Sequence, residues 1–443
     1  MQFWVDVVTV RPEGYVEDAE GNVEITTAEG MAWLISEVNG FNGCAGNDFS
    51  GRTVTLKNDI DMSAWTWVSI GIDEQHGFSG SFHGSGNTIE GIHLDYHAIS
   101  QPYAGMFGCI KHATVSDLVL RSGNIVGDSY VGGIAGLSDS MSMVNNCVVD
   151  VEVDGSDKTG GVVGVNKNST IRNCCYVAEE IGLYENYAGG ISGVNYADYS
   201  DAEVRNCYVL SSFICSYSTK YAGGLVGWNG TSEGSDKKAV VENGYATSDD
   251  IYGYAQYIGG VVGQNEHGDV LYCYSSEINN QSTFPPVGMD NGNTRNCTNF
   301  AIGEGANTLF EAITINGTST NDLLEALNLW VTNQSDITLF AKWHNDASSG
   351  MPVFDAFRYS EGVYTHEPIS SAVEIFPNPA SNTVAVSGID VDQITIFDNM
   401  GNIVKLHENG NVVNVSTLSN GMYHLVILSK QGTIHKKQLI IVR

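Results

Sequence analysis

Apolar and polar residues alternate with a period of two through the middle of this chain, from about residue 104 to residue 275. Segments 142–153, 169–177 and 202–210 each carry the apolar face of an extended strand, and the 3.6-residue spacing of a helix is missing from this stretch. Polar turns and pairs of glycine separate the segments. The pattern therefore predicts an all-β region of short strands.

The strands belong to a repeat. Five near-copies, VGGIAGLS, GGVVGVN, GGISGVN, GGLVGWN and GGVVGQN, recur every 28 to 36 residues, and AGMFG at 104–108 is a weaker sixth. A unit of this length cannot close a core of its own, so the copies must stack. We expect a right-handed parallel β-helix, with glycine where two backbones approach too closely for a Cβ. One repeated position is expected to form a ladder of bonded amides: Asn166, Asn195, Asn229 and Asn265.

Two segments outside the array, 26–40 and 320–331, show an apolar helical face, and we expect each helix to cap one end of the stack. Residues 359–371 are polar and irregular, and about seven short strands with regular turn signals follow them. The predicted organisation is an N-terminal segment with a capping helix (1–50), a β-helix (51–300), a C-terminal cap of the solenoid (301–358), a linker (359–371) and a small Ig-like β-sandwich (372–443).

Charge and hydropathy exclude several partners. The 20 Lys and Arg residues against 51 Asp and Glu give a net charge of −31, which disfavours nucleic acid and anionic membranes. The chain contains no run of eighteen apolar residues, so no membrane-spanning helix is predicted. The first residues lack the pattern of a signal peptide, so we expect a trimmed N-terminus if the protein is exported. No cofactor is predicted; bound Ca²⁺, with Asp59 and Asp61 on one strand face, is the weaker alternative to a purely structural role.

Nine cysteines cannot all pair within one chain. Four occupy matching places in the repeats: Cys147, Cys174, Cys207 and Cys273. Equivalent positions on adjacent coils lie about 4.8 Å apart, within reach of a disulfide. Buried free thiols are the expected state, and a redox or metal cluster is the alternative.

Catalytic chemistry finds little support. The chain has no H-E-x-x-H, G-x-S-x-G or P-loop motif, and the basic residues of the array do not repeat on successive coils. His93 and His97 would have metal-ligand spacing on a helix, but they fall in a strand and turn, so no metal site is predicted. We therefore assign no catalytic residue and favour a protein that is not an enzyme. A polysaccharide lyase or glycoside hydrolase on the same scaffold is the alternative.

One repeated feature is a candidate for ligand binding. Tyrosines precede the glycine pairs by two residues, with Lys158 breaking the series: Tyr103, Tyr130, Tyr187, Tyr221 and Tyr257. Rings that face solvent would form an aromatic strip suited to sugars, whereas rings turned toward a corner would serve packing. The longer coils also insert loops near 195–203 and 229–238, where repeat proteins often bind partners.

The glycine-rich repeats followed by Asn-Cys strands resemble GLUG-motif proteins of Bacteroidetes-type bacteria. The resemblance covers roughly residues 24–355 and extends from TAEGMAWLISEVNG to LLEALNLWV and MPVF. It implies a β-helical surface or secreted protein of adhesin-like type. Some relatives carry a peptidase, but the missing H-E-x-x-H means that this activity does not extend to this chain.

The last 70 or so residues resemble the type A C-terminal sorting domain of the type IX secretion system. The matching motif residues are Pro377, Asn378, Pro379, Gly401, Gly421 and Tyr423, with the closing KKQLIIVR. The resemblance implies export across the outer membrane, removal of the domain and attachment to the cell surface. The expected protein is thus secreted or surface-attached, with the secretion machinery and a glycan or a host or bacterial surface protein as partners.

Overall fold

A computed structural model describes residues 8, 10–96, 101–183, 186–216, 220–253, 256–276, 284–302, 307–354, 374–376, 380–387, 391–397, 403–408, 410–430 and 434–442. The chain divides into two compact units, Met1–Arg358 and Tyr359–Arg443. The predicted linker, 359–371, lies outside the described residues. Each unit is described here by itself.

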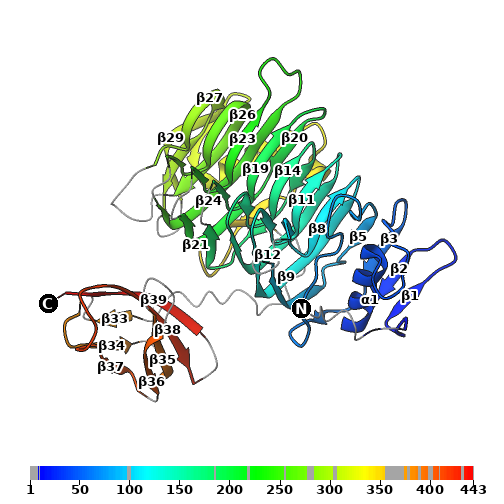
Figure 1. The fold of residues 1–443 in the computed structure, drawn as a ribbon. Coiled ribbons are helices and arrows are strands. Elements are labelled where there is room, and N and C mark those ends of the chain that lie inside the picture. The colour runs from blue at the N-terminus through cyan, green and yellow to red at the C-terminus, as the bar shows by residue number, and fades with distance from the viewer. Residues whose placement is uncertain are drawn as a thin grey trace. The chain divides into compact units, whose positions relative to one another are not determined.

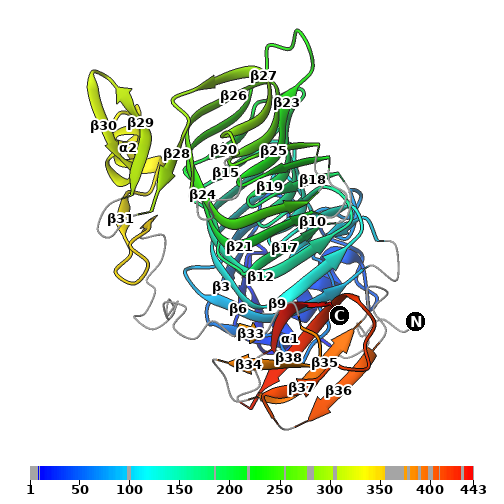
Figure 2. The same cartoon turned by 90° about the vertical axis from the view of Figure 1, so that its left-hand side faces the viewer.

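The first unit is a parallel β-helix whose coils stack as predicted (Figures 1 and 2). Most coils contribute a strand to each of three parallel rows. The first row is a six-stranded sheet of β7 (Tyr103–Ala104), β10 (Tyr130–Gly132), β13 (Thr159–Gly160), β18 (Tyr187–Gly189), β22 (Tyr221–Gly223) and β25 (Tyr257–Gly259). The second row contains β8 (Phe107–Lys111), β11 (Ala135–Asp139), β14 (Val163–Lys167), β19 (Ser192–Ala197), β23 (Val226–Thr231), β26 (Val262–Ser276) and β27 (Val287–Arg295).

The third row is the longest side of the coils. It contains β9 (Thr114–Gly127), β12 (Met143–Gly155), β15 (Thr170–Arg172), β16 (Cys175–Tyr176), β17 (Glu180–Leu183), β20 (Ala202–Arg205), β21 (Tyr208–Ser216), β24 (Ala239–Gly253) and β28 (Thr298–Ala301). β26 runs on from the second row into this one and pairs with β24 and β28.

The repeated glycines allow the first row to fold back onto the second. A Cβ on Gly136 would lie 2.6 Å from the carbonyl oxygen of Tyr130, and one on Gly132 would lie 2.4 Å from that of Ala135. Contacts this short exclude any side chain at the two positions. Close approach of backbones, as predicted, therefore explains the glycine motif.

The N-terminal end is closed by a helix and short strands. α1 (Ala28–Asn39) begins behind Thr27, whose Oγ1 accepts from the Gly30 amide, and ends at Gly40 in the left-handed conformation. Its apolar face joins the core of the first coils. Figure 1 shows α1 beside the strands that begin the stack: β1 (Tyr15–Glu17), β2 (Val23–Ile25), β3 (Thr53–Leu56), β4 (Ile60–Asp61), β5 (Ser81–His83) and β6 (Thr88–Asp95).

Inside the coils, polar ladders accompany the apolar core. Asn166 donates to the Oδ1 of Asn195 at 2.8 Å, Asn195 to that of Asn229 at 2.8 Å, and Asn229 to that of Asn265 at 2.9 Å. All four amides are fully buried, which confirms the predicted ladder. The repeated cysteines Cys147, Cys174, Cys207 and Cys273 are buried free thiols, also as predicted.

Asparagines in the left-handed conformation bend the third row, and two of them come directly before Cys174 and Cys207. Asn173, Asn206 and Asn243 have φ of 51°, 52° and 52°. Asn243 donates to the Oδ1 of Asn206, and Asn206 to that of Asn173, each at 2.8 Å. These side chains form a second asparagine ladder, at a corner of the coils.

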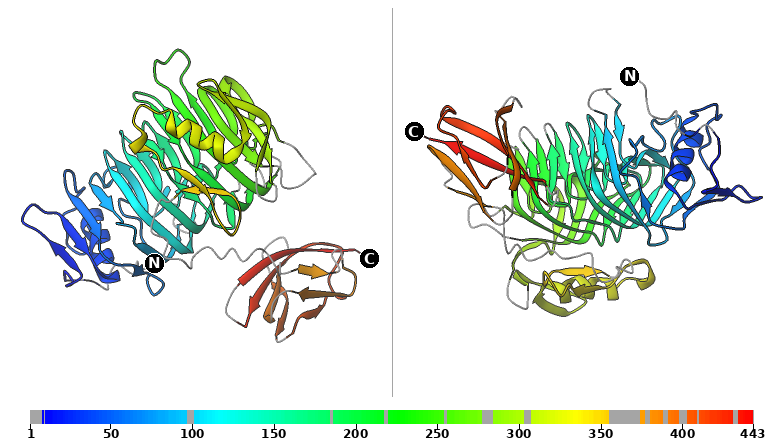
Figure 3. Two further views of the ribbon diagram at one scale, coloured as in Figure 1. Left: turned by 180° about the vertical axis from the view of Figure 1, so that it is seen from behind. Right: turned by 90° about the horizontal axis from the view of Figure 1, so that it is seen from below.

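The predicted second helix, α2 (Leu323–Thr332), lies along the side of the coils and not across their end (Figures 2 and 3). Trp330 donates to Glu242 Oε1 at 3.0 Å, and Trp343 donates to Asn206 Oδ1 at 2.9 Å. This position differs from the expected cap because the corner asparagines offer partners for the chain that follows the helix. The lateral segment consists of β29 (Thr308–Ile315), β30 (Thr318–Asp322), α2, the 3₁₀ helix Ile337–Leu339, β31 (Trp343–Asn345) and β32 (Pro352–Phe354).

The second unit is the predicted small sandwich of two antiparallel sheets. Its buried core includes Val384, Ile394, Val413, Leu425 and Leu439, which come from both sheets. One sheet contains β33 (Glu374–Phe376), β34 (Thr383–Ser387) and β37 (Val412–Asn414). The other contains β36 (Ile403–Glu408), β35 (Val391–Phe397), β38 (Gly421–Ser429) and β39 (Ile434–Ile441).

Candidate functional site

The tyrosines of the first row form a ladder. Parallel pairing in register aligns Tyr130 with Tyr103, and Tyr221 with Tyr187 and Tyr257. Ring centroids lie 4.9 Å apart for Tyr103 and Tyr130, 5.1 Å for Tyr187 and Tyr221, and 5.6 Å for Tyr221 and Tyr257. The last two pairs are nearly parallel, at 20° and 13°, so these rings stack face to face.

The ladder packs on an apolar row that is separate from the core inside the coils. Cys109, Leu137, Val165 and Val194 of the second row form this buried cluster. Burial raises the pKa of the Cys109 thiol to about 12, which keeps it an inert apolar group at neutral pH. The partly buried rings that cover the cluster are Tyr103, Tyr130, Tyr187, Tyr196 and Trp228. The tyrosines therefore lie on the outside of the coils.

Lys158 occupies the position where the tyrosine series is broken. Its ammonium nitrogen is 5.1 Å from the ring centre of Tyr130 and 5.9 Å from that of Tyr187. A cation at such distances from two rings is attracted by both. Lys158 also forms an ion pair with Asp157. The ladder is thus continuous across the break, with a lysine in the place of a ring.

Stacking determines what the ladder presents to a ligand. Neighbouring rings cover each other's faces along Tyr187, Tyr221 and Tyr257. Tyr221 is only 8% exposed. A sugar ring therefore cannot stack on the covered faces of the ladder.

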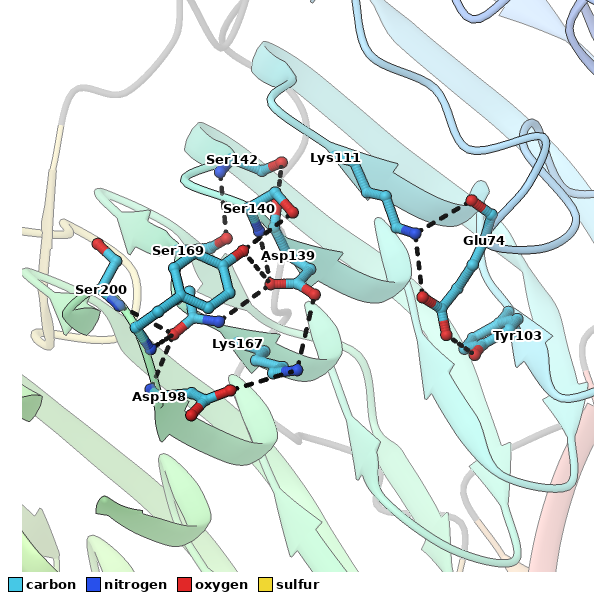
Figure 4. Close-up of polar contacts among 12 residues, drawn as sticks. Glu74, Tyr103, Lys111, Asp139, Ser140, Ser142, Lys167, Ser169, Asp198 and Ser200 are labelled. Atoms are coloured by element: carbon cyan, nitrogen blue, oxygen red, sulfur yellow. Dashed lines mark hydrogen bonds and ion pairs between the residues drawn. The ribbon is translucent and has the colours of Figure 1, made fainter. Parts of the chain in front are cut away.

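Charged residues lie beside the ladder, at the outward ends of the second-row strands (Figure 4). β11 pairs with β8 so that Asp139 lies opposite Lys111. The ammonium of Lys167, at the end of β14, is 3.9 Å from Asp139 Oδ2 and 3.9 Å from Asp198 Oδ2. Both distances exceed hydrogen-bond length, so these groups attract one another without a direct hydrogen bond.

The carboxylate of Asp139 is held in one orientation. Its Oδ1 accepts from the Ser140 amide at 2.6 Å, from Asn168 Nδ2 at 3.2 Å and from the Tyr199 hydroxyl at 3.2 Å. Three donors occupy Oδ1, while Oδ2 is directed toward Lys167. Asp139, Lys167, Asp198 and Tyr199 are called the Asp139 cluster below.

The inserted loop after β19 is fastened to the preceding coil by Asn168. The side-chain oxygen of Asn168 accepts from the backbone amides of Asp198, Tyr199 and Ser200 at 2.8, 3.1 and 3.3 Å. The Tyr199 hydroxyl also lies 3.1 Å from Ser140 Oγ. Tyr199 is nevertheless 52% exposed, so the loop holds an aromatic ring at the surface in a fixed place.

Glu74 joins the ladder to this charged row. Its carboxylate accepts from Lys111 Nζ and from the Tyr103 hydroxyl, both at 3.0 Å. The hydrogen bond from Lys111, followed by that from Tyr103, lowers the pKa of Glu74 below its usual value. Burial, followed by the hydrogen bond to Glu74, raises the pKa of Tyr103. The carboxylate is therefore ionised and the phenol neutral near pH 7.

The remaining sequence candidates have structural contacts or lie outside the described residues. Asp59 Oδ1 accepts from the Thr88 amide of the next coil at 2.7 Å, and Asp61 Oδ1 accepts from the Ser63 amide at 2.8 Å within a local turn. His93 lies 2.7 Å from Asn124 Oδ1, and His97 is not described. Within the described ranges, no group of three or more His, Cys, Asp or Glu side chains is arranged to hold a metal ion.

Sequence reasoning predicted the inserted loop at 195–203 but missed most of the Asp139 cluster. Lys167 is one of the basic residues of the array that do not repeat on successive coils. The signal that could have identified Lys167 is its position in the coil. Equivalent residues on three successive coils, one after the inward position that Asn166 occupies, alternate in charge: Lys111, Asp139 and Lys167.

Comparison with known families assigns the second unit. Residues 374–442 match the family described as "Secretion system C-terminal sorting domain". Comparison with curated proteins and with solved structures finds no match to the chain. In the described residues no helix is long and apolar enough to cross a membrane.

Two motif residues of this domain have clear structural roles. Gly421 begins β38 with φ of 154°, and the hydroxyl of buried Tyr423 donates to the Ser419 carbonyl at 3.0 Å. The other expected motif residues, Pro377, Asn378, Pro379 and Gly401, lie outside the described residues. The chain is a β-helix followed by a C-terminal sorting domain, and this domain implies secretion by the type IX secretion system.

Proposed function

We propose that this protein is an adhesin-like β-helix that binds a glycan or a surface protein outside the cell. The sorting domain supplies the export that such a role needs, and the repeats resemble those of GLUG-motif proteins. The observation that carries the proposal is the outer face of the second row. There an inserted loop is fastened to the coils and holds Tyr199 and Asp198 at the surface, beside the partly exposed Lys167 and the buried Asp139.

The tyrosine ladder contributes the wall beside this face. Its half-buried rings fix the shape of the surface beside the loop. The five tyrosines are therefore proposed as secondary contacts, with the Asp139 cluster at the centre.

The proposal is tested with the purified full chain, labelled, on arrays of glycans and on intact bacterial and host cells. The matched variant replaces residues 197–202 with Asn-Ser, the two-residue turn of the preceding coil, because Lys167 pairs with Tyr196 and Thr170 with Glu203. We expect the parent chain to bind and the short-loop variant to lose most binding while it remains folded, as checked by its circular dichroism. Equal binding by both chains, or no binding by the parent, would refute the proposal.

Export is tested in the same way in cells that carry the secretion system. Deleting residues 372–443 is expected to retain the protein inside the cell, and fractionation of full-length cultures would show whether the exported protein is released or stays on the outer membrane. Retention of the deleted chain supports the export signal only; the binding role is decided by the array experiment.

The alternative is a polysaccharide lyase or glycoside hydrolase on the same scaffold. A lyase needs cations free to neutralise a uronate carboxylate. On this face Lys111 is bonded to Glu74 and Lys167 lies between two aspartates, which favours binding over elimination. Release of reducing ends or of unsaturated products from polysaccharides by the purified chain would support the enzyme instead.

A further inference from the structure

We propose that the Asp139 cluster is a subsite for one pyranose residue of a neutral glycan, with the ring of Tyr199 as its platform. The inference rests on the proposed binding function and narrows it to one class of ligand. It concerns four side chains from three consecutive coils, which the inserted loop brings to one place on the outer face.

Tyr199 has the properties of a stacking platform that the ladder tyrosines lack. Rings of the ladder cover one another, whereas Tyr199 is 52% exposed. Its backbone amide and its hydroxyl are both bonded to the preceding coils, through Asn168 and Asp139. A ring held in this way stacks on the apolar face of a sugar with little loss of side-chain entropy.

Polar groups beside the platform match the hydroxyls of a sugar. Lys167 Nζ lies 3.9 Å from each of Asp139 Oδ2 and Asp198 Oδ2, a gap that a direct hydrogen bond does not close. A hydroxyl bound there accepts from the ammonium and donates to a carboxylate, so it satisfies both groups at once. Because Asp139 Oδ1 is already fixed by three donors, Oδ2 is pre-oriented for this contact.

Charge indicates that the glycan is neutral. The subsite contains two carboxylates and one ammonium, and the whole chain has a net charge of −31. Uronate or sulfate groups would be repelled by both. A neutral sugar is not repelled, and its hydroxyls have one ammonium and two carboxylates as hydrogen-bond partners.

The experiment titrates the full chain with neutral hexasaccharides of β-linked glucose, galactose, mannose and xylose, and with polygalacturonate as the acidic probe. Saturation-transfer NMR and calorimetry measure contact and affinity. We expect at least one neutral hexamer to bind, Tyr199→Ala to weaken it about tenfold and Tyr199→Phe about threefold, since the ring remains but its hydroxyl bonds are lost. Lys167→Met and Asp198→Asn are each expected to weaken it several-fold.

Phe310→Ala is the matched control, because Phe310 is 53% exposed on β29 in the lateral segment. It should bind like the parent, and all variants should keep the parental melting temperature. Binding that Tyr199→Ala leaves unchanged, tighter binding of polygalacturonate, or no binding of any neutral hexamer would overturn the subsite. If the chain then still binds cells or a protein through the 198–201 loop, the subsite fails while the proposed function stands; if it binds nothing, both fail.

Discussion

Asn166 and Lys167 are neighbours in β14, yet they belong to different parts of the molecule. Asn166 is inward and fully buried, and the same residue recurs at its position on the next three coils. Lys167 is outward, and the equivalent residues on adjacent coils are Asp139 and Tyr196. Within these four coils the inward residue is constant, because each amide bonds to the same group on the next coil. The outer position is free to vary, so the variation there is where a partner-binding role can develop.

The largest expected effect tests the inner side of this comparison. Asn166→Ala removes donors to Asn195 Oδ1 and to the Ser169 carbonyl, both in the interior. It should lower the free energy of unfolding by about 3 kcal/mol, because buried acceptors are left without partners. Lys167→Ala, one residue away, should change it by less than about 0.5 kcal/mol. Urea unfolding of the two variants measures the difference, and similar losses would remove the distinction between inner and outer positions.

A smaller loss is expected from the tyrosine ladder, whose rings are packed but lie outside the core. Tyr221→Ala should cost about 2 kcal/mol, because Tyr187 and Tyr257 both lose a stacked neighbour. Tyr221→Phe keeps the stacking and should be nearly neutral. Thermal unfolding compares them, and glycan binding by the Phe variant reports whether the hydroxyl serves the partner. A silent Ala variant would show that the ladder carries no packing energy.

Lys158 sharpens the comparison further, because it is the one departure from the tyrosine series. Lys158→Met should cost about 1 kcal/mol through loss of the contact with two rings and of the pair with Asp157. Lys158→Tyr should recover most of this loss by completing the stack. The matched control is Lys220→Met, because Lys220 is exposed and contacts the single ring of Tyr221. Equal effects at 158 and 220 would argue against a role for the cation within the ladder.

The smallest effect concerns Glu242, where the lateral segment meets the coils. Burial raises the pKa of Glu242 above its ordinary 4.5, against the hydrogen bond from Trp330. The folded protein thus binds this proton more tightly than the unfolded chain, and this term lowers stability as pH rises from about 4.5 through the folded pKa. Glu242→Gln keeps an acceptor for Trp330 but does not titrate. Its melting temperature relative to the parent should rise between pH 4 and pH 7; a constant difference would contradict the shift.

Repetition explains which parts of the structure were predictable. The glycine pairs, the asparagine ladder and the buried thiols were inferred because a stacked fold places the same constraint on every coil. The place of α2 was not, since nothing in an amphipathic pattern states which apolar surface it will cover. The lateral segment bonds to Glu242 and to the corner asparagines. The left-handed conformation of these asparagines appears only in the folded coils.

The candidate site was predictable only in part. The loop at 195–203 stood out as an insertion, and the tyrosines stood out as a series. The direction of the rings and the gathering of Lys167, Asp139 and Asp198 depend on register between coils, which a sequence with unequal spacings leaves open. Asn168, which fastens the loop, resembles the other asparagines in sequence and differs from them only in its partners.

The lateral segment is bonded to three successive coils at fixed positions. The carbonyls of Leu339 and Ala341 accept from Asn173 and Asn206, and the Pro352 carbonyl accepts from the hydroxyl of Tyr245. Three successive coils are thereby matched to fixed points on a segment that follows more than a hundred residues later in the chain. Duplicating or deleting a coil between Asn173 and Tyr245 would therefore separate at least one of these side chains from its carbonyl partner.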